Sequence, residues 1–487
     1  MGVLDDLRPE SVFHFFEEIS RIPRRSGNER QISDYLKQFA KERGLACIQD
    51  DLYNIIIIKE ATPGYEQEEP YILQGHMDMV AVKKPDCDLD LAKDPLRLCV
   101  KDGRVSAEGT SLGGDDGIAV AYILALLDAQ EICHPRLEMV VTTEEETGLT
   151  GANGIDLSML HGRQLINLDN EEEGAIITSC AGGARVDVAI PVQWEQTQGP
   201  GMTVLQVAVK GLLGGHSGSE IDKGRGNANW LLGRILQATA EQYAIRLAHM
   251  QGGQADNAIP RHAYAVIEVL AEEREKIAAL IGGEADKIKE ELDAADPNFY
   301  VECTELSGDD REVQKSVSAV STKQVLSCMT SLPNGVIAMS GDVEGLVQTS
   351  LNLGVMRMQE EGLHLTYAVR SSIDQEKEEL CQKMQTIASK AGARTAIKSS
   401  YPGWAYRKES PLREKAVSVY EKMYGRKPEL QAIHAGLECG ILASKIAGLD
   451  CISIGPDMSD VHTTEESLSV ESTARVWEYL LAILAEK

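Results

Sequence analysis

The chain of 487 residues has few basic residues for its size. It carries 48 Lys and Arg against 76 Asp and Glu, which gives a formal net charge of −28. A protein that neutralises the phosphates of a nucleic acid or binds an anionic membrane surface needs clustered Lys and Arg. The acidic excess therefore argues against both kinds of partner.

Long apolar runs and paired cysteines are also missing. The densest apolar run, Ile55 to Ile58, is far too short to cross a bilayer. The first ten residues carry Asp5 and Asp6 where a secretory signal would place basic and then apolar residues. The ten cysteines are scattered singly from Cys47 to Cys451 without a CxxC pair, which is typical of a reducing compartment. We therefore expect a soluble, cytoplasmic protein.

The composition is that of a globular protein, with 43% hydrophobic and 25% charged residues. In residues 1–185, apolar segments with helical and extended periodicity alternate along the chain. Helices are expected at about 11–22, 28–42 and 117–129, and strands at about 53–58, 71–75, 138–143 and 164–168. Near-continuous apolar strands between helices predict an α/β fold with a mainly parallel sheet covered on both faces.

The pattern changes at about residue 186 and returns near residue 400. Strands such as 186–192, 203–211 and 362–372 alternate between apolar and polar residues, and helices are expected at about 228–246 and 375–390. This pattern predicts an α+β domain of antiparallel strands with helices on one face. We therefore expect a discontinuous first domain, residues 1–185 and 401–487, with a second domain inserted at 186–400.

Residues suited to metal chemistry follow the predicted strands of the first domain. Ligands of open α/β sheets bind at the carboxyl ends of the strands, so these side chains are expected to converge. They are His76 and Asp78, Glu144 to Glu146, Asp169 and His462, joined by Asp115 and Asp116 at the start of a long helix.

Each of these motifs has a structural reading when it is taken alone. The Asp pair in GGDDG suits a helix N-terminus, and a Glu triplet suits a solvated surface. Together, however, the carboxylates would repel one another unless a cation neutralised them. Imidazole and carboxylate ligands without thiolate favour zinc, cobalt or manganese.

The motifs resemble those of the cocatalytic-zinc metallopeptidases, a group that includes peptidase T, aminoacylases, glutamate carboxypeptidase and carnosinases. The resemblance extends over essentially the whole chain. It rests on GHMDM at 75–79, GGDDG at 113–117, EETG at 145–148, LDNEEEG at 168–174 and His462. GGHSG at 214–218 and HAGLECG at 434–440 are most similar to the members that hydrolyse Xaa-His dipeptides.

The resemblance implies two divalent metal ions, with zinc expected and cobalt or manganese as alternatives. It implies that Asp115 bridges the two ions and is followed by a cis peptide bond. The remaining metal ligands would be His76 and Asp169 at one ion and Glu146 and His462 at the other. Asp78 would orient His76, and Glu145 would be the general base.

The inserted domain of such enzymes is a lid that also forms the interface of a homodimer. The resemblance implies that His216 of the lid stabilises the oxyanion, often in the partner's site. It also implies that Asn257 and Arg370 bind substrate and that Gly436 offers a backbone N–H. Glu438 has no role that the motifs suggest, and Arg370 is equally suited to a surface salt bridge.

The resemblance implies metal-dependent hydrolysis of dipeptides, including Xaa-His dipeptides, by water activated by two metal ions. An N-acyl amino acid deacylase or a carboxypeptidase of the same group is an alternative, because the metal residues are common to all of them. A catalytically inactive scaffold protein is a second alternative, which would be indicated by the loss of a ligand or of the base. Every expected position is filled in this sequence.

Overall fold

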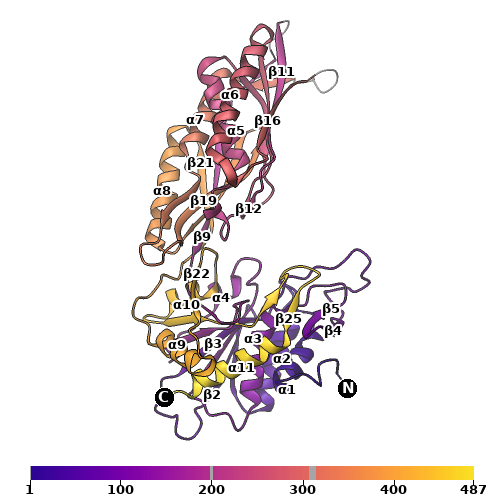
Figure 1. Ribbon diagram of the computed structural model, residues 1–487, viewed down its shortest axis with the longest axis vertical. Coiled ribbons are helices and arrows are strands. Elements are labelled where there is room, and N and C mark those ends of the chain that lie inside the picture. The colour runs from indigo at the N-terminus through magenta and orange to yellow at the C-terminus, as the bar shows by residue number, and fades with distance from the viewer. Residues whose placement is uncertain (1, 198–200, 307–313) are drawn as a thin grey trace. The chain divides into compact units, whose positions relative to one another are not determined.

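The computed structural model describes residues 2–197, 201–306 and 314–487 (Figure 1). The chain forms two compact units. The first comprises Met1–Ser179, Tyr406–Ala432 and Leu437–Lys487, and the second comprises Cys180–Ala405 and Ile433–Gly436. The boundaries expected from the sequence were near residues 185 and 400, and the return of 433–436 to the second unit was not anticipated. Residues 198–200 and 307–313 of the expected insertion lie outside the described residues.

The first unit is built on an eight-stranded sheet. In spatial order its strands are β1 (Ala46–Gln49), β2 (Ile55–Lys59), β6 (Leu137–Thr142), β3 (Tyr71–His76), β7 (Gln164–Asn167), β23 (Asp450–Ser453), β8 (Ala175–Cys180) and β22 (Glu429–Ile433). The central strands β6, β3, β7 and β23 are parallel. The pairs β1–β2, β2–β6 and β23–β8 are antiparallel.

Both faces of the central strands are covered, as the apolar sequence predicts. Every residue of β3 and β6 is buried. The helices of this unit are α1 (Glu10–Ser20), α2 (Arg30–Glu42), α3 (Gly114–Asp128), α4 (Thr150–Gly154), α9 (Pro411–Tyr424), α10 (Glu438–Lys445) and α11 (Val470–Ala485). Helix α3 is apolar all round and packs against α1 and β3. The predicted mixed α/β fold is therefore confirmed.

The first unit also contains a small four-stranded sheet, one loop of which includes a predicted metal ligand. It contains β4 (Leu98–Lys101), β5 (Arg104–Ala107), β24 (Met458–Ser459) and β25 (Ser467–Ser469), in the order β24-β25-β5-β4. The loop between β24 and β25 includes His462. This sheet thereby fixes a loop that lies far along the chain from the other predicted site residues.

The second unit is built on a nine-stranded sheet whose neighbouring strands are antiparallel. Eight strands follow one another in the order β16 (Tyr300–Glu305), β11 (Met202–Lys210), β15 (Ala263–Leu270), β13 (Arg246–Gly252), β19 (Val347–Met358), β20 (Gly362–Ser371), β9 (Gly182–Pro191) and β21 (Arg394–Tyr401), and β18 (Gly335–Met339) also pairs with β19. Two short pairs complete the unit: β10 (Trp194–Gln196) with β17 (Lys315–Val317), and β12 (Gly215–His216) with β14 (Ala258–Ile259).

Helices cover one face of this sheet (Figure 1). They are α5 (Ala228–Gln242), α6 (Arg274–Leu292), α7 (Ala319–Ser331) and α8 (Asp374–Lys390). They share one hydrophobic core with the sheet, whereas alternate residues of strands such as β20 are only partly buried. Among the described residues, no helix is both long enough and apolar enough to cross a membrane.

Candidate metal centre

The carboxyl ends of three neighbouring parallel strands deliver the predicted ligands. His76 is the last residue of β3, Glu145 and Glu146 follow β6, and Asp169 follows β7. Because β3 lies between β6 and β7, these side chains meet at one edge of the sheet. The start of α3 adds Asp115 to them.

Asp115 lies between the two predicted histidine ligands. Its Oδ1 is 3.0 Å from Nε2 of His76, and its Oδ2 is 3.0 Å from Nε2 of His462. Burial acts to raise the pKa of Asp115, but the hydrogen bonds to His462 and His76 hold it well below its usual range. Each carboxylate oxygen therefore faces a different imidazole, as a ligand shared by two ions must.

Each histidine also has a second carboxylate nearby. Nε2 of His76 lies 3.6 Å from Oδ1 of Asp169, and Nε2 of His462 lies 2.8 Å from Oε1 of Glu146. Asp115, Glu146 and His462 form one group whose donor atoms all lie within 4.8 Å of one another. Hydrogen bonds to Asp115 and Glu146 raise the pKa of His462 to about 11.

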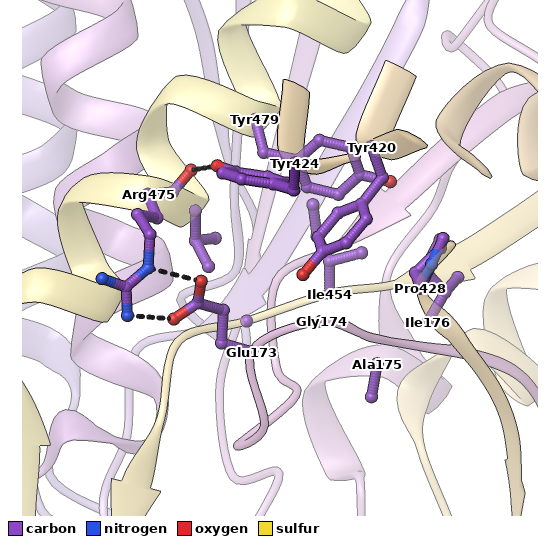
Figure 2. Close-up of a pocket in the computed structure, with 12 residues that line it drawn as sticks. Glu173, Gly174, Ala175, Ile176, Tyr420, Tyr424, Pro428, Ile454, Arg475 and Tyr479 are labelled. Carbon is purple, nitrogen blue, oxygen red and sulfur yellow. Dashed lines mark hydrogen bonds and ion pairs between the residues drawn. The ribbon is translucent and has the colours of Figure 1, made fainter. Parts of the chain in front are cut away.

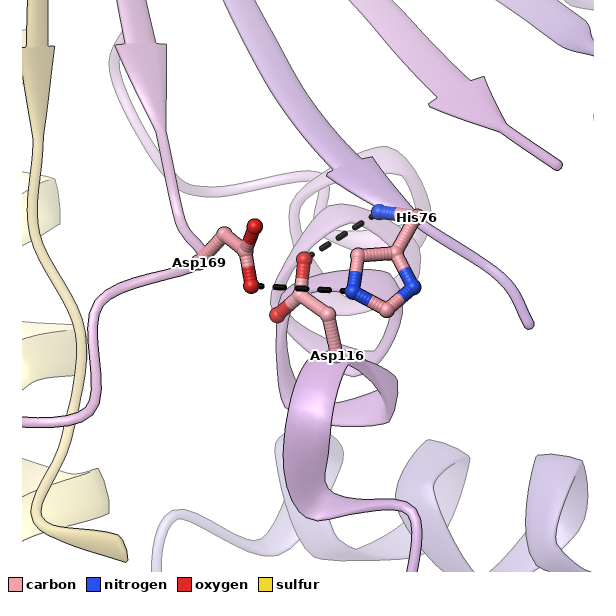
Figure 3. A group of neighbouring side chains, drawn as sticks. All are labelled: His76, Asp116 and Asp169. Atoms are coloured by element: carbon pink, nitrogen blue, oxygen red, sulfur yellow. Dashed lines mark hydrogen bonds and ion pairs between the residues drawn. The ribbon is translucent and has the colours of Figure 1, made fainter. Parts of the chain in front are cut away.

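Asp116 is a further carboxylate at the site that the sequence analysis left without a role. It forms a donor group with His76 and Asp169 (Figure 3). One of its oxygens accepts a hydrogen bond from the backbone N–H of His76 at 3.1 Å. Burial and the nearby Asp169 raise its pKa well above the usual range. The peptide bond between Asp115 and Asp116 is cis, as the resemblance implied.

Asp78 lies behind the metal donors and contacts several of them. Its Oδ1 is 3.3 Å from Nδ1 of His76, and its two oxygens accept hydrogen bonds from the backbone N–H groups of Glu145 and Glu146. The hydroxyl of Ser26 donates to it at 2.8 Å. Asp78 thus links the imidazole of His76 to the segment that follows β6, which is how an orienting carboxylate acts.

Glu145 lies among other acidic groups. Burial raises its pKa well above the usual range, and the charges of Asp169, Glu438 and Asp115 act in the same direction. Burial also raises the pKa of Asp169 to about 8. A site that holds these carboxylates together therefore favours a bound cation, which offsets their repulsion. The donors available, imidazole and carboxylate, fit a divalent transition metal.

The predicted substrate residues lie in the second unit. His216 ends β12 and pairs with Ala258, beside Asn257, whose carbonyl accepts from the backbone N–H of Ser217 at 2.7 Å. Nδ1 of His216 accepts hydrogen bonds from the N–H groups of Gly218 and Ser219 at 3.3 and 3.1 Å. Since an accepting nitrogen carries no proton, the neutral ring carries its proton on Nε2.

Arg370 and Gly436 adjoin Tyr401 in the same unit. Nη1 of Arg370 lies 3.5 Å from the hydroxyl of Tyr401, and a Cβ on Gly436 would lie 2.9 Å from the Tyr401 ring. Burial lowers the pKa of His216, and the positive charge of Arg370 lowers it further. Arg370 makes no side-chain ion pair with a carboxylate among the described residues, and its Nε has no partner there.

Four buried residues near these groups were not identified from the sequence as functional. In the first unit, Arg24, Glu438 and Glu466 are at most 2% exposed, and in the second unit His434 is 6% exposed. Charged side chains are almost never fully buried unless they are paired. The available signals were Glu438 and His434 in the HAGLECG motif and Glu466 in the loop that follows His462.

A small cavity in the first unit lies beside a tyrosine cluster (Figure 2). Its lining includes Tyr420, Tyr424, Tyr479, Arg475 and Glu173. Arg475 and Glu173 form a bidentate ion pair with N–O distances of 2.6 and 2.7 Å. It encloses about 10 Å³, room for about one water molecule. None of the predicted site residues is among the described side chains that line it, so we assign it a structural role.

An α/β unit that gathers His and carboxylate donors beside the carboxyl ends of its parallel strands has the kind of site that a metallohydrolase uses. Residues 72–486 match the model of peptidase family M20/M25/M40, and the chain belongs to that family. The family predicted from the motifs is thus confirmed.

Full-length relatives agree with this assignment. The cytosol non-specific dipeptidase of Escherichia coli (strain K12) is 36% identical over 487 residues, covering 100% of this chain and 99% of that protein. The crystal structure of aminoacylhistidine dipeptidase from Vibrio alginolyticus matches with a TM-score of 0.92 and 35% identity, covering 99% and 97% of the two chains. Aminopeptidase PepT from Bacillus cereus ATCC 10987 matches with a TM-score of 0.56 and 17% identity over 98% of each chain, which supports the fold alone.

Proposed function

We propose that this chain is a two-metal dipeptidase whose substrates include Xaa-His dipeptides. The observation that carries the proposal is the position of Asp115, whose two oxygens each lie 3.0 Å from a different histidine. The full-length similarity to a cytosol non-specific dipeptidase and to an aminoacylhistidine dipeptidase supports the substrate class. The name of the first relative also supports a cytoplasmic location.

His76, Asp115 and Asp169 would hold one ion, and Asp115, Glu146 and His462 would hold the other. Asp115 is assigned the shared position because it faces both histidines, whereas Asp116 accepts from the backbone of His76. Zinc is proposed, with cobalt or manganese as alternatives, because the donors are imidazole and carboxylate. When bound, two such ions supply a reactive water at neutral pH and polarise the scissile carbonyl.

Glu145 is proposed as the general base. Its carboxylate would take a proton from the attacking water as the water oxygen bonds to the scissile carbonyl carbon. It would then pass that proton to the nitrogen of the leaving amine as the C–N bond breaks. Asp78 would hold the segment in place, since it accepts hydrogen bonds from the backbone of both Glu145 and Glu146.

His216 is proposed to stabilise the negative charge that develops on the carbonyl oxygen. The hydrogen bonds to its Nδ1 leave Nε2–H as the donor, and its lowered pKa keeps the ring neutral. Arg370 would pair with the C-terminal carboxylate of the substrate, and Asn257 and the N–H of Gly436 would bind the peptide. We also propose that the second unit is a lid and that it forms the interface of a homodimer.

The test combines metal analysis with a substrate panel. The purified chain is expected to bind two divalent ions and to hydrolyse Xaa-His dipeptides, β-alanyl-histidine and other unblocked dipeptides. N-acetylated amino acids and blocked dipeptides are the matched controls. Hydrolysis of N-acyl amino acids alone would replace the dipeptidase with a deacylase, and absence of bound metal would overturn the metal centre.

A further inference from the structure

The start of α3 is held by a buried carboxylate from a distant loop. Four consecutive backbone N–H groups, those of residues 112–115, point at the side chain of Glu466. Those of Leu112 and Gly113 donate to Oε2 at 2.8 and 3.0 Å, and those of Gly114 and Asp115 donate to Oε1 at 2.8 and 3.4 Å. Glu466 is 2% exposed and lies in the same loop as His462. Both of its oxygens are therefore fully engaged by the loop that carries Asp115.

A buried arginine donates a hydrogen bond to a backbone carbonyl of the same loop. Arg24, 1% exposed, donates from Nη2 to the carbonyl of Gly113 and from Nη1 to the carbonyls of Met77 and Asp78 at 3.1 and 3.2 Å. The last two carbonyls directly follow His76. Arg24 thus ties the loop of Asp115 to the segment of His76, as Glu466 ties it to the loop of His462.

The glycines of the GGDDG motif leave space for these two side chains. A Cβ on Gly113 or Gly117 would lie 2.6 or 2.4 Å from Nη2 of Arg24. A Cβ on Gly114 would lie 3.3 Å from Oε1 of Glu466 and 3.2 Å from Sδ of Met458. The motif therefore supplies the two aspartates and also the glycines that leave space for the side chains of Arg24 and Glu466.

We propose that Glu466 and Arg24 are positioning residues that hold Asp115 between His76 and His462, and so set the affinity for both metal ions. The inference rests on the proposed metal centre. Neither side chain belongs to a candidate donor group. They act through the backbone. Glu466 orients the N–H groups of residues 112–115, and Arg24 fixes the carbonyl of Gly113 and the two carbonyls that follow His76. A shared ligand that shifts loses both ions, whereas a shifted terminal ligand loses one.

The first experiment compares Glu466→Gln with Glu465→Gln. In Glu466→Gln one acceptor oxygen becomes an NH₂ group that faces two N–H donors, whichever way the amide turns. Glu465 is the matched control, because it is an exposed neighbour that pairs with Lys84 at the surface. Affinity for Zn²⁺ is measured by competition with a chromophoric chelator, and the visible spectrum of the Co²⁺-loaded protein reports the coordination.

Glu466→Gln is expected to weaken binding at both positions by about 10- to 100-fold and to change the Co²⁺ spectrum. Added metal is expected to restore part of the dipeptidase activity. Glu465→Gln is expected to match the wild type in all three readouts. Wild-type affinity and spectrum in a folded Glu466→Gln variant would overturn the proposal, as would the loss of only one ion.

Gly114→Ala and Arg24→Lys test the proposal if Glu466→Gln does not fold. Gly114 does not have a positive φ, so the added methyl acts mainly by its close contacts with Glu466 and Met458, whereas its contact with Leu112 at 3.5 Å is an ordinary one. Both variants are expected to lose affinity at both positions, with Arg25→Lys, at an exposed residue, as the control for Arg24. Unchanged affinity in both would refute the positioning role. A wild-type chain that bound no metal would instead refute the metal centre itself.

Discussion

Glu145 differs from its acidic neighbours in what surrounds it. It follows β6, lies among Asp169, Glu438 and Asp115, and has a pKa that burial raises well above the usual range. The adjacent Glu146 faces His462 instead, at 2.8 Å. Glu145 also belongs to a candidate donor group with His76 and Glu146, so the two successive carboxylates differ in the second histidine: Glu146 alone of the two is grouped with Asp115 and His462.

Replacing Glu145 by Gln is expected to abolish turnover while metal binding is kept. The amide has nearly the same shape but cannot accept the proton of the attacking water, so kcat should fall by at least about 100-fold. Steady-state kinetics and metal analysis of the same sample check the prediction. Glu144→Gln, the same change at a side chain outside the candidate donor groups, is the control. Full activity of Glu145→Gln would exclude the base assignment.

His434 is a buried histidine kept neutral by its surroundings. It is 6% exposed, and its Nε2 lies 2.7 Å from the hydroxyl of Ser350. Burial lowers its pKa to about 4, and the positive charges of Arg370 and of a protonated His216 act in the same direction. An unfolded histidine has a pKa near 6.5, so between these values the unfolded chain binds the proton and the folded chain does not.

His434 is therefore expected to cost stability as the pH falls from 7 to 4. The loss approaches about 3 kcal/mol, because each pKa unit of difference is worth about 1.4 kcal/mol. Urea unfolding across this range should show that the free energy of unfolding of His434→Gln rises relative to that of the wild type as the pH falls. The exposed His161→Gln is expected to follow the wild type. A difference between His434→Gln and the wild type that does not change with pH would contradict the assignment.

At the scale of elements, a buried polar layer links α10 to three strands. Glu438, at the start of α10, accepts from the hydroxyl of Thr142 in β6 at 2.6 Å and from the amide of Gln74 in β3. Gln74 in turn accepts from the amide of Asn167 in β7 at 2.7 Å. All four side chains are fully buried, at 0% exposure. The layer thus joins the three strands whose ends carry the predicted metal ligands.

Glu438→Ala is expected to destabilise the chain by about 3 kcal/mol. The change removes the shared acceptor and leaves only longer hydrogen bonds, from the Thr142 hydroxyl to the Gly75 carbonyl at 3.3 Å and from the Gln74 amide to the Thr142 hydroxyl at 3.4 Å. A poorly satisfied buried polar group costs about 1–3 kcal/mol. Chemical denaturation measures the free energy of unfolding. Glu421→Ala, at an exposed position of α9, is the control and should stay within about 0.5 kcal/mol of the wild type. Equal effects of the two changes would show that the layer contributes nothing.

At the scale of the whole molecule, the residues of the proposed mechanism are divided between the two units. The proposed metal ligands and Glu145 belong to the first unit, and His216, Asn257, Arg370 and Gly436 belong to the second. The net negative charge of the chain does not predict the local charge of the proposed metal centre. Three carboxylate ligands and two divalent ions would nearly balance there, inside a chain of net charge −28.

Mixing two inactive variants tests whether His216 acts in the site of a partner subunit. His216→Ala and Glu145→Gln chains are expected to recover activity when their subunits exchange, because one site of each mixed dimer has both groups intact. With random exchange, about a quarter of wild-type activity should return. Mixed dimers isolated with two different affinity tags provide the measurement. Isolated mixed dimers without activity would show that His216 acts within its own chain.

The sequence by itself determined which residues gather at the candidate centre. His76 ends a strand, Glu145, Glu146 and Asp169 lie within a few residues of strand ends, and parallel strands bring their carboxyl ends to one edge. The apolar pattern therefore sufficed to predict the convergence and the α/β fold. It did not reveal that β2 pairs antiparallel with β6, because strand order depends on contacts between distant segments.

Only the tertiary structure decided what holds these residues in place. Arg24 reaches the carbonyl of Gly113 across 89 positions of sequence, and Glu466 reaches its N–H across 353. Periodicity and local motifs carry no signal for such contacts, so GGDDG read as a helix start with two aspartates. The structure shows that the glycines of this motif leave space for the buried side chains of Arg24 and Glu466. The physical reason is that a charge is buried only where partners converge on it, and those partners come from segments that the fold alone brings together.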